Sequence, residues 1–191
     1  LHGLSKYSML WWRSYRLMMR KERFKKLFLM IMNALLILAW TSVFAYAWYQ
    51  MIKDFGGNAV RPHAQPWPRV YYDLADEMGL MVLDETALFG SSIRLNFEEE
   101  LTWQRSHEHL KRLILRDRNH PSVIGWSAGN ETFAIALLNK PEKEVAAVWD
   151  DKLVDLTLSA RKSDPTRDFI TLDGDRDMEG RLPVWSKHFA H

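Results

Sequence analysis

The sequence predicts an α/β fold in which parallel strands alternate with helices, in the manner of a (β/α) barrel. Short apolar runs alternate with longer segments whose apolar residues recur at helical spacing. Several of these runs end in polar or charged residues, and a (β/α) barrel carries its functional site at that edge of its strands. A doubly wound open sheet is the alternative, although no glycine-rich phosphate loop follows the first run.

The charges divide the 191-residue chain into a basic head and a mildly acidic body. The formal net charge is +2, but residues 1–26 hold eight Lys or Arg and one acid, which leaves 18 basic and 23 acidic residues in the remainder. The body therefore lacks the positive field that phosphate binding requires, and no nucleic acid is expected as a partner. The absence of cysteine excludes disulfides and thiolate zinc sites.

Residues 1–47 are predicted to be a basic, hydrophobic signal peptide or membrane anchor. No charged residue occurs from Leu27 to Tyr49, and a helix of this length, at ~1.5 Å per residue, spans a ~30 Å bilayer core. The basic flank favours a cytoplasmic amino end, which places the body outside the cytoplasm, in the periplasm or extracellular space or anchored to the membrane. Ala45 and Ala47 also stand in the A-x-A relation of a signal peptidase site. A cleaved signal, an anchor through residues 27–49 and a buried core helix all remain open.

The first half of the body contains two predicted strands and one helix. Residues 58–61 form a short strand after the Gly56-Gly57 turn. Pro68 stands in the first turn of the helix and Gly79 caps its end. Residues 80–83 are a continuous apolar run, which is typical of a strand buried on both faces.

The second half repeats this alternation. Asn96 is predicted to cap a helix that has glutamates in its first turn, and a strand at residues 123–126 follows. The next helix is predicted at about residues 143–161, with one apolar side. That side consists of Val145, Val148, Trp149, Leu153 and Leu156. Strands at 169–172 and 182–185 complete the pattern.

The most specific motif is RDRNHPSVIGWSAGNE at residues 116–131. It resembles the barrel domain of glycoside hydrolase family 2, which includes β-galactosidases, β-glucuronidases and β-mannosidases. In that family an R-D-(R/K)-N-H-P-S-(V/I)-x-x-W-S-x-G-N-E run forms the fourth barrel strand. Residues 48–61 and 73–85 also look like helix-and-strand segments of this barrel. The resemblance implies that residues 48–191 are a partial (β/α)8 TIM barrel, about strands 2–6, with a carbohydrate as substrate.

The resemblance also implies roles for the last two residues of the motif. Glu131 matches the general acid/base, and Asn130 matches the residue that contacts the sugar 2-hydroxyl. Retaining hydrolysis of a β-glycoside requires one carboxyl group to exchange the proton and a second to attack the anomeric carbon. In the family the second group is a glutamate on the seventh strand, so the resemblance implies that the nucleophile is missing from this chain.

Other substrate-binding candidates lie at predicted strand ends. Arg61 matches the arginine of the family pattern N-A-V-R-x-S-H-Y-P, but His63 stands one place before the usual histidine, where Ala64 occurs instead. Asp84 and Glu85 are expected to face the site, or else to form a salt bridge with Arg61. Trp185 and His188 are expected to form a stacking platform and a hydrogen-bonding partner for the sugar.

Two functional readings follow, and neither needs a cofactor. The first is an exported glycosidase of which this chain is part, and the rival is a truncated, non-catalytic or membrane-tethered carbohydrate-binding fragment. No metal site is expected. In the acidic run that starts at Asp173, Met178 stands where a calcium loop needs glycine and Val184 where it needs glutamate, and the His107/His109 pair matches no zinc motif.

Overall fold

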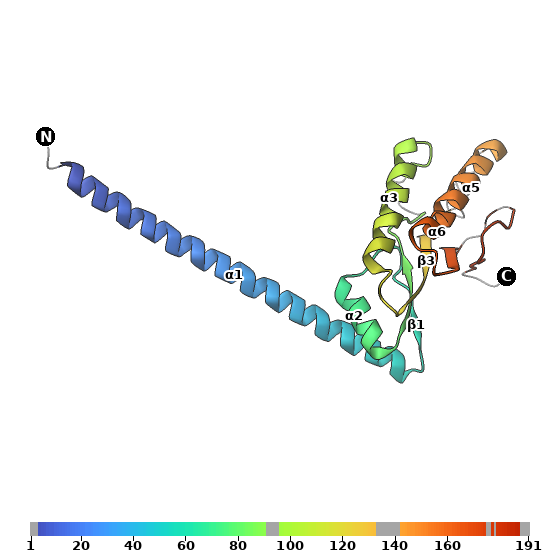
Figure 1. The fold of residues 1–191 in the computed structure, drawn as a ribbon, viewed down its shortest axis with the longest axis horizontal. Helices are drawn as coiled ribbons and strands as arrows, with labels where there is room; N and C mark the ends of the chain where they lie inside the picture. Colours follow the sequence, from blue (N-terminus) through green and yellow to red (C-terminus); the bar gives the residue numbers. More distant parts are fainter. Residues whose placement is uncertain (1–3, 91–95, 133–141, 175–176, 178, 188–191) are drawn as a thin grey trace. The chain divides into compact units, whose positions relative to one another are not determined.

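The computed structural model describes residues 4–90, 96–132, 142–174, 177 and 179–187, with side chains from residue 17 onward except that of Asp173. The chain divides into two compact units, Leu1–Tyr46 and Ala47–His191. Helix α1, Leu4–Asp54, runs through the first unit and supplies the beginning of the second (Figure 1).

The first unit is a helix whose apolar side chains are exposed. Leu27, Met30, Ile37 and Trp40 are all at least half exposed. By length and composition, the segment Leu17–Asp54 is able to cross a membrane, a property that signal sequences share. The hydroxyl of Thr41 donates to the Ile37 carbonyl one turn earlier, so this polar group is satisfied within the helix.

The second unit is a parallel sheet whose strands alternate along the chain with helices (Figure 1). The strands are β1 (Ala59–Val60), β2 (Met81–Glu85), β3 (Val123–Asn130) and β4 (Phe169–Asp173). The helices that follow α1 are α2 (Arg69–Met78), α3 (Glu100–Asp117), α5 (Lys143–Leu158) and α6 (Ala160–Ser163). Each strand lies beside the next in the order β1-β2-β3-β4, and every pair is parallel. A doubly wound sheet reverses its strand order at a switch point, so this uninterrupted order is that of a barrel segment.

The register aligns polar residues across the sheet near the carboxyl ends of the strands. Glu85 pairs with Ser127, and Ser127 pairs with Thr171. Residues paired in this way point to the same face, because side chains alternate along each strand. Beyond a register shift, Asn130 at the end of β3 pairs with Asp173 at the end of β4.

The opposite face of the sheet packs against the helices and forms the core. Trp126 and Ile170 are fully buried on the strands, and Tyr72, Ile114 and Leu156 are fully buried on the helices. The last turns of α1 belong to this unit, and Tyr49 is fully buried in its core. The Trp126 indole donates to Asp164 (3.0 Å), which satisfies its polar group within the apolar layer.

Local signals at the ends of α1 and α2 are confirmed. Gly79 caps α2 with φ +69° and donates to the Ala75 carbonyl, and Gly56 follows α1 with φ +81°. Both backbones lie in the left-handed region that favours glycine. Pro68 stands immediately before the first helical residue, where its missing N–H costs nothing.

Three predicted details are wrong. Residues 182–184 form bends and residue 185 is irregular, so no strand forms here, since Pro183 cannot donate to a sheet ladder. Asn96 caps a turn by accepting from the Glu98 amide, and α3 starts only at Glu100. On α5, Leu153 and Leu156 are buried as predicted, but Val145 and Val148 are exposed, so the buried side is only partly the predicted one. That side consists of Ala146, Asp150, Leu153, Val154, Leu156 and Thr157.

Candidate active site

An arginine from the end of β1 and a glutamate from the end of β2 form the centre of the candidate site. One guanidinium nitrogen of Arg61, Nη1, lies 2.8 Å from both carboxylate oxygens of Glu85. Glu85 is fully buried, and the Ser127 hydroxyl from β3 lies 2.8 Å from its Oε2 atom. The Ala64 amide donates to Oε1 from the loop that follows β1. A buried carboxylate with this many donors is held in one position.

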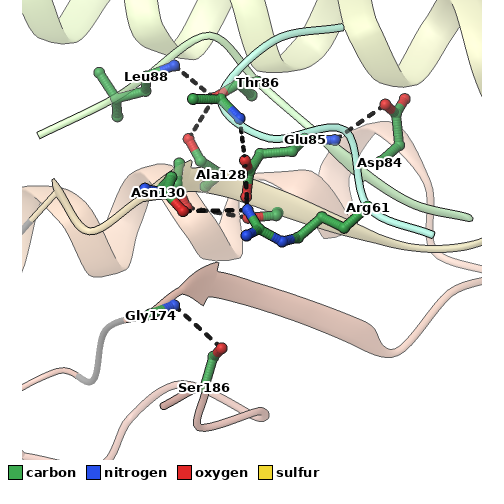
Figure 2. A network of polar contacts seen from close by, with 12 residues as sticks. Arg61, Asp84, Glu85, Thr86, Leu88, Ala128, Asn130, Gly174 and Ser186 are labelled. Carbon is green, nitrogen blue, oxygen red and sulfur yellow. Dashed lines mark hydrogen bonds and ion pairs between the residues drawn. The ribbon is translucent and has the colours of Figure 1, made fainter. Parts of the chain in front are cut away.

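The same guanidinium nitrogen reaches Asn130 at the end of β3. The distance from Arg61 Nη1 to Asn130 Oδ1 is 3.1 Å, and Figure 2 shows Arg61 between Glu85 and Asn130. Asn130 is fully buried. Its Nδ2 atom has no hydrogen-bond partner within the described part of the chain, although a buried amide normally has one.

Glu131 follows β3 with an unusual backbone conformation. Its φ of +46° lies in the left-handed region that non-glycine residues seldom adopt, and its side chain is partly exposed. A Cβ atom on Gly90 would collide with the Glu131 carbonyl oxygen, so glycine is required at this close approach. Strained backbones of this kind occur preferentially at functional sites.

The loop after β2 fixes the backbone on either side of Asn130. The Asn130 amide donates to the Leu88 carbonyl (2.8 Å), and the Gly90 amide donates to the Asn130 carbonyl (3.1 Å). The Thr86 hydroxyl donates to the Ala128 carbonyl (2.6 Å), as Figure 2 shows. The His109 Nε2 atom on α3 accepts a hydrogen bond from the Ala87 amide (3.0 Å). Burial, together with the Arg116 charge, lowers the pKa of His109, which favours the neutral ring that this bond requires.

Asp84 does not join this cluster. It is fully buried, and its Oδ1 atom accepts from the Tyr72 hydroxyl of α2 at 2.6 Å, on the helix side of the sheet. Burial raises the pKa of Asp84 to about 8, with the neighbouring Asp117 charge acting in the same direction and the Tyr72 hydrogen bond opposing it. Of the two alternatives given for these carboxylates, Glu85 forms the salt bridge with Arg61. Asp84 points to the opposite face, because side chains alternate along a strand.

The remaining candidates lie toward the edges of the described region. The exposed ring of His63 packs edge-on against Phe89, with 5.5 Å between the ring centroids. Trp185 is 66% exposed, and its neighbour Ser186 accepts a hydrogen bond from the Gly174 amide just after β4 (Figure 2). His188 lies outside the described residues.

Three residues of this region were missed by sequence reasoning. Ser127 was detectable in principle, because it pairs with Glu85 once the strand register is known. Phe89 and Tyr72 carry no comparable signal, since a strand-end loop and a helix face contain many aromatic residues without function. Within the described ranges, no group of three or more His, Asp or Glu side chains is arranged to hold a metal ion.

A family model and several curated relatives match this chain. The model described as glycosyl hydrolases family 2, TIM barrel domain, matches residues 41–186. A putative β-glucuronidase of Formosa agariphila is 33% identical over 151 residues, which cover 74% of this chain and 13% of the relative. A β-galactosidase of Lactococcus lactis subsp. lactis is 37% identical over 86 residues, which cover 44% of this chain and 9% of the relative.

Solved structures show the same similarity. The crystal structure of Parabacteroides merdae β-glucuronidase superposes with a TM-score of 0.55 at 25% identity. The match covers 66% of this chain and 15% of that protein. A second β-glucuronidase structure, from Bacteroides uniformis, gives a TM-score of 0.53 at 28% identity, with 66% and 15% covered. The chain thus spans a small part of the length of the proteins it matches.

Proposed function

Because this chain belongs to glycosyl hydrolase family 2, we propose that it carries the proton-donor side of a retaining β-glycosidase site, with Glu131 as general acid/base. The observation that carries this proposal is the Asn130-Glu131 step at the carboxyl end of β3. There a strained glutamate backbone follows a buried amide whose NH₂ group has no partner among the residues that the structure describes. A parallel barrel places its reactive groups at this edge of the strands.

The chemistry requires two roles of one carboxyl group. In the first step Glu131 donates a proton to the glycosidic oxygen as the bond to the leaving group breaks, and a second carboxylate attacks the anomeric carbon. In the second step Glu131 accepts a proton from the water that hydrolyses the glycosyl-enzyme intermediate. In this proposal Asn130 binds the 2-hydroxyl of the sugar, where a hydrogen bond strengthens as charge develops on the ring.

The second carboxylate comes, in this proposal, from barrel strands beyond the four described here. Glu85 is an unsuitable nucleophile, because Arg61, Ser127 and the Ala64 amide occupy its two oxygens. We use "complete enzyme" for the polypeptide that carries this chain together with the remaining barrel strands. The 191-residue chain alone is expected to hydrolyse no aryl β-glycoside.

Azide rescue in the complete enzyme tests the role of Glu131. With 2,4-dinitrophenyl β-glycosides the leaving group departs without protonation, so the Glu131→Ala variant still forms the intermediate but lacks the base that activates water. Turnover is expected to fall roughly 10²- to 10⁴-fold. Added azide, which needs no base, should restore turnover and give the β-glycosyl azide. The β-galactoside and the β-glucuronide are the first substrates to try, because the relatives carry these names.

The control for this test is Glu144→Ala, which removes an exposed glutamate from the first turn of α5. It should leave turnover unchanged and insensitive to azide. An α-configured azide product, or no loss of turnover in Glu131→Ala, would contradict the assignment of Glu131. Saccharide binding without turnover in the complete enzyme would favour the rival non-catalytic function.

We also infer that the site meets its carbohydrate outside the cytoplasm. The support is the exposed apolar segment of α1 and the basic residues that precede it, which favour a cytoplasmic amino end. A cleaved signal and a retained anchor lead to the same location for residues 48–191.

A further inference from the structure

We propose that Glu85 is a positioning residue: acting through Arg61, it holds the Asn130 amide with its oxygen toward the protein and its NH₂ group toward the substrate. The inference rests on the proposed function in one respect, namely that Asn130 binds the sugar 2-hydroxyl. It assigns Glu85 no contact with the sugar.

The contacts of Glu85 leave its carboxylate little capacity for a ligand. Oε1 accepts from Arg61 and from the Ala64 amide, and Oε2 lies within 2.8 Å of Arg61 and of Ser127. The side chain is also fully buried. The Glu85 carboxylate therefore interacts with protein groups, and its strongest interaction is with the charged guanidinium group of Arg61.

The Arg61 contact identifies which end of the Asn130 amide faces the protein. A guanidinium group has only donors, so the atom 3.1 Å from Nη1 must be the amide oxygen. The opposite orientation would place an NH₂ group against a positive charge. Arg61 therefore determines the amide orientation, and Glu85 determines the position of Arg61.

The backbone of Asn130 is held by the neighbouring loop. Its main-chain N–H group donates to the Leu88 carbonyl, and its main-chain carbonyl accepts from the Gly90 N–H group. The NH₂ group, directed away from Arg61, is buried and has no partner within the described residues. Such a group is a donor prepared for an acceptor oxygen on a ligand, and the 2-hydroxyl oxygen of a sugar is an acceptor of this kind.

Loss of the Glu85 charge should therefore affect one substrate group selectively. In Glu85→Gln the side chain keeps its size, but Arg61 loses its buried counter-charge and the amide of Asn130 loses its fixed orientation. A substrate with a 2-hydroxyl group would then lose a prepared donor, whereas a 2-deoxy substrate has no such interaction to lose.

The test measures kcat/KM of the complete enzyme on a 4-nitrophenyl β-glycoside and on its 2-deoxy analogue. Glu85→Gln is expected to reduce kcat/KM roughly tenfold on the 2-hydroxy substrate and less than about twofold on the 2-deoxy substrate. The same selectivity is expected of Asn130→Ala. In the Asn130→Ala background, Glu85→Gln should have no further selective effect.

Ser127→Ala provides a milder variant in case Glu85→Gln does not fold. It removes one neighbour of Oε2 and should give a smaller change with the same preference for the 2-deoxy substrate. Equal losses on both substrates, or a selective loss that persists in the Asn130→Ala background, would overturn the positioning role. Azide rescue of Glu131→Ala is independent of these ratios, so failure of the proposed function remains distinguishable from failure of this inference.

Discussion

Asp84 and Glu85, adjacent at the end of β2, carry the same carboxyl group in two different environments. Glu85 points to the inner face and is neutralised by Arg61, whereas Asp84 points to the helices and contacts the Tyr72 hydroxyl. The sequence indicates that two acidic residues end this strand, and their alternation follows from strand geometry. It does not indicate which of them meets the arginine, because that depends on the register between β1 and β2 and on the loop that carries Ala64.

The buried position of Asp84 predicts a pH-dependent stability. Because burial raises the pKa of Asp84 from 3.8 to about 8, the folded state keeps a proton that the unfolded state releases between about pH 4 and pH 8. Stability should therefore fall as pH rises through this window. Asp84→Asn keeps the acceptor for Tyr72 and does not titrate. We expect its Tm, measured by circular dichroism, to exceed that of the parent at pH 8 by more than at pH 4.

A suitable control is Asp73→Asn, which changes an exposed residue of the neighbouring helix α2. Its Tm should run parallel to that of the parent across the same pH range. If the Tm of Asp84→Asn also ran parallel to that of the parent, the buried proton would not lie on Asp84.

Most helices and strands could be predicted from the sequence, because continuous apolar runs indicate buried strands and glycines indicate helix ends. Residues 80–83 and 123–126 were predicted as strands, and residues 81–83 and 123–126 lie in strands of the sheet. The pattern failed at residues 182–185, where an apolar run contains Pro183. It also gave no sign of the loop 86–90, whose pairing with β3 depends on single backbone hydrogen bonds that leave no periodicity.

The contact between His109 and the loop 86–90 predicts that the stability of the fold decreases in acid. The pKa of His109 is lowered by burial and by Arg116, and its neutral Nε2 atom accepts from the Ala87 amide. As pH falls below about 6.5, the unfolded state takes up a proton more readily than the folded state, so stability should decrease. His109→Gln retains an acceptor and does not titrate. We expect urea unfolding to show a smaller loss of stability between pH 7.5 and pH 5 in this variant.

The matched control is His107→Gln on the same helix, where the histidine is partly exposed and lies 3.5 Å from Asp155. This variant should keep the acid sensitivity of the parent. If His107→Gln and His109→Gln reduced that sensitivity equally, the contact with the Ala87 amide would not be its source.

At the scale of the whole molecule, the chain combines one apolar helix with part of a barrel. The four strands have two outer edges, β1 and β4, and a (β/α)8 barrel pairs such edges with further strands. The family resemblance predicted a partial barrel, about strands 2–6, and the described strands form such a segment. Sequence reasoning could not determine the Arg61–Glu85–Asn130 contacts, because they join three strands whose relative heights only the folded sheet sets.

The apolar helix provides the prediction that concerns the whole chain. Ile37 lies in the middle of the exposed apolar segment, and an arginine at the centre of such a helix costs about 3 kcal/mol on insertion scales. In bacterial cells the parent chain should be recovered in the membrane fraction, or outside the cytoplasm at a mass lacking residues 1–47. Ile37→Arg should instead leave the chain in the cytoplasm at full mass. Met51→Arg makes a similar change at an exposed position nearer the end of α1 and should behave as the parent. Equal fractionation of the two variants would mean that residues 27–49 do not direct the protein to the membrane.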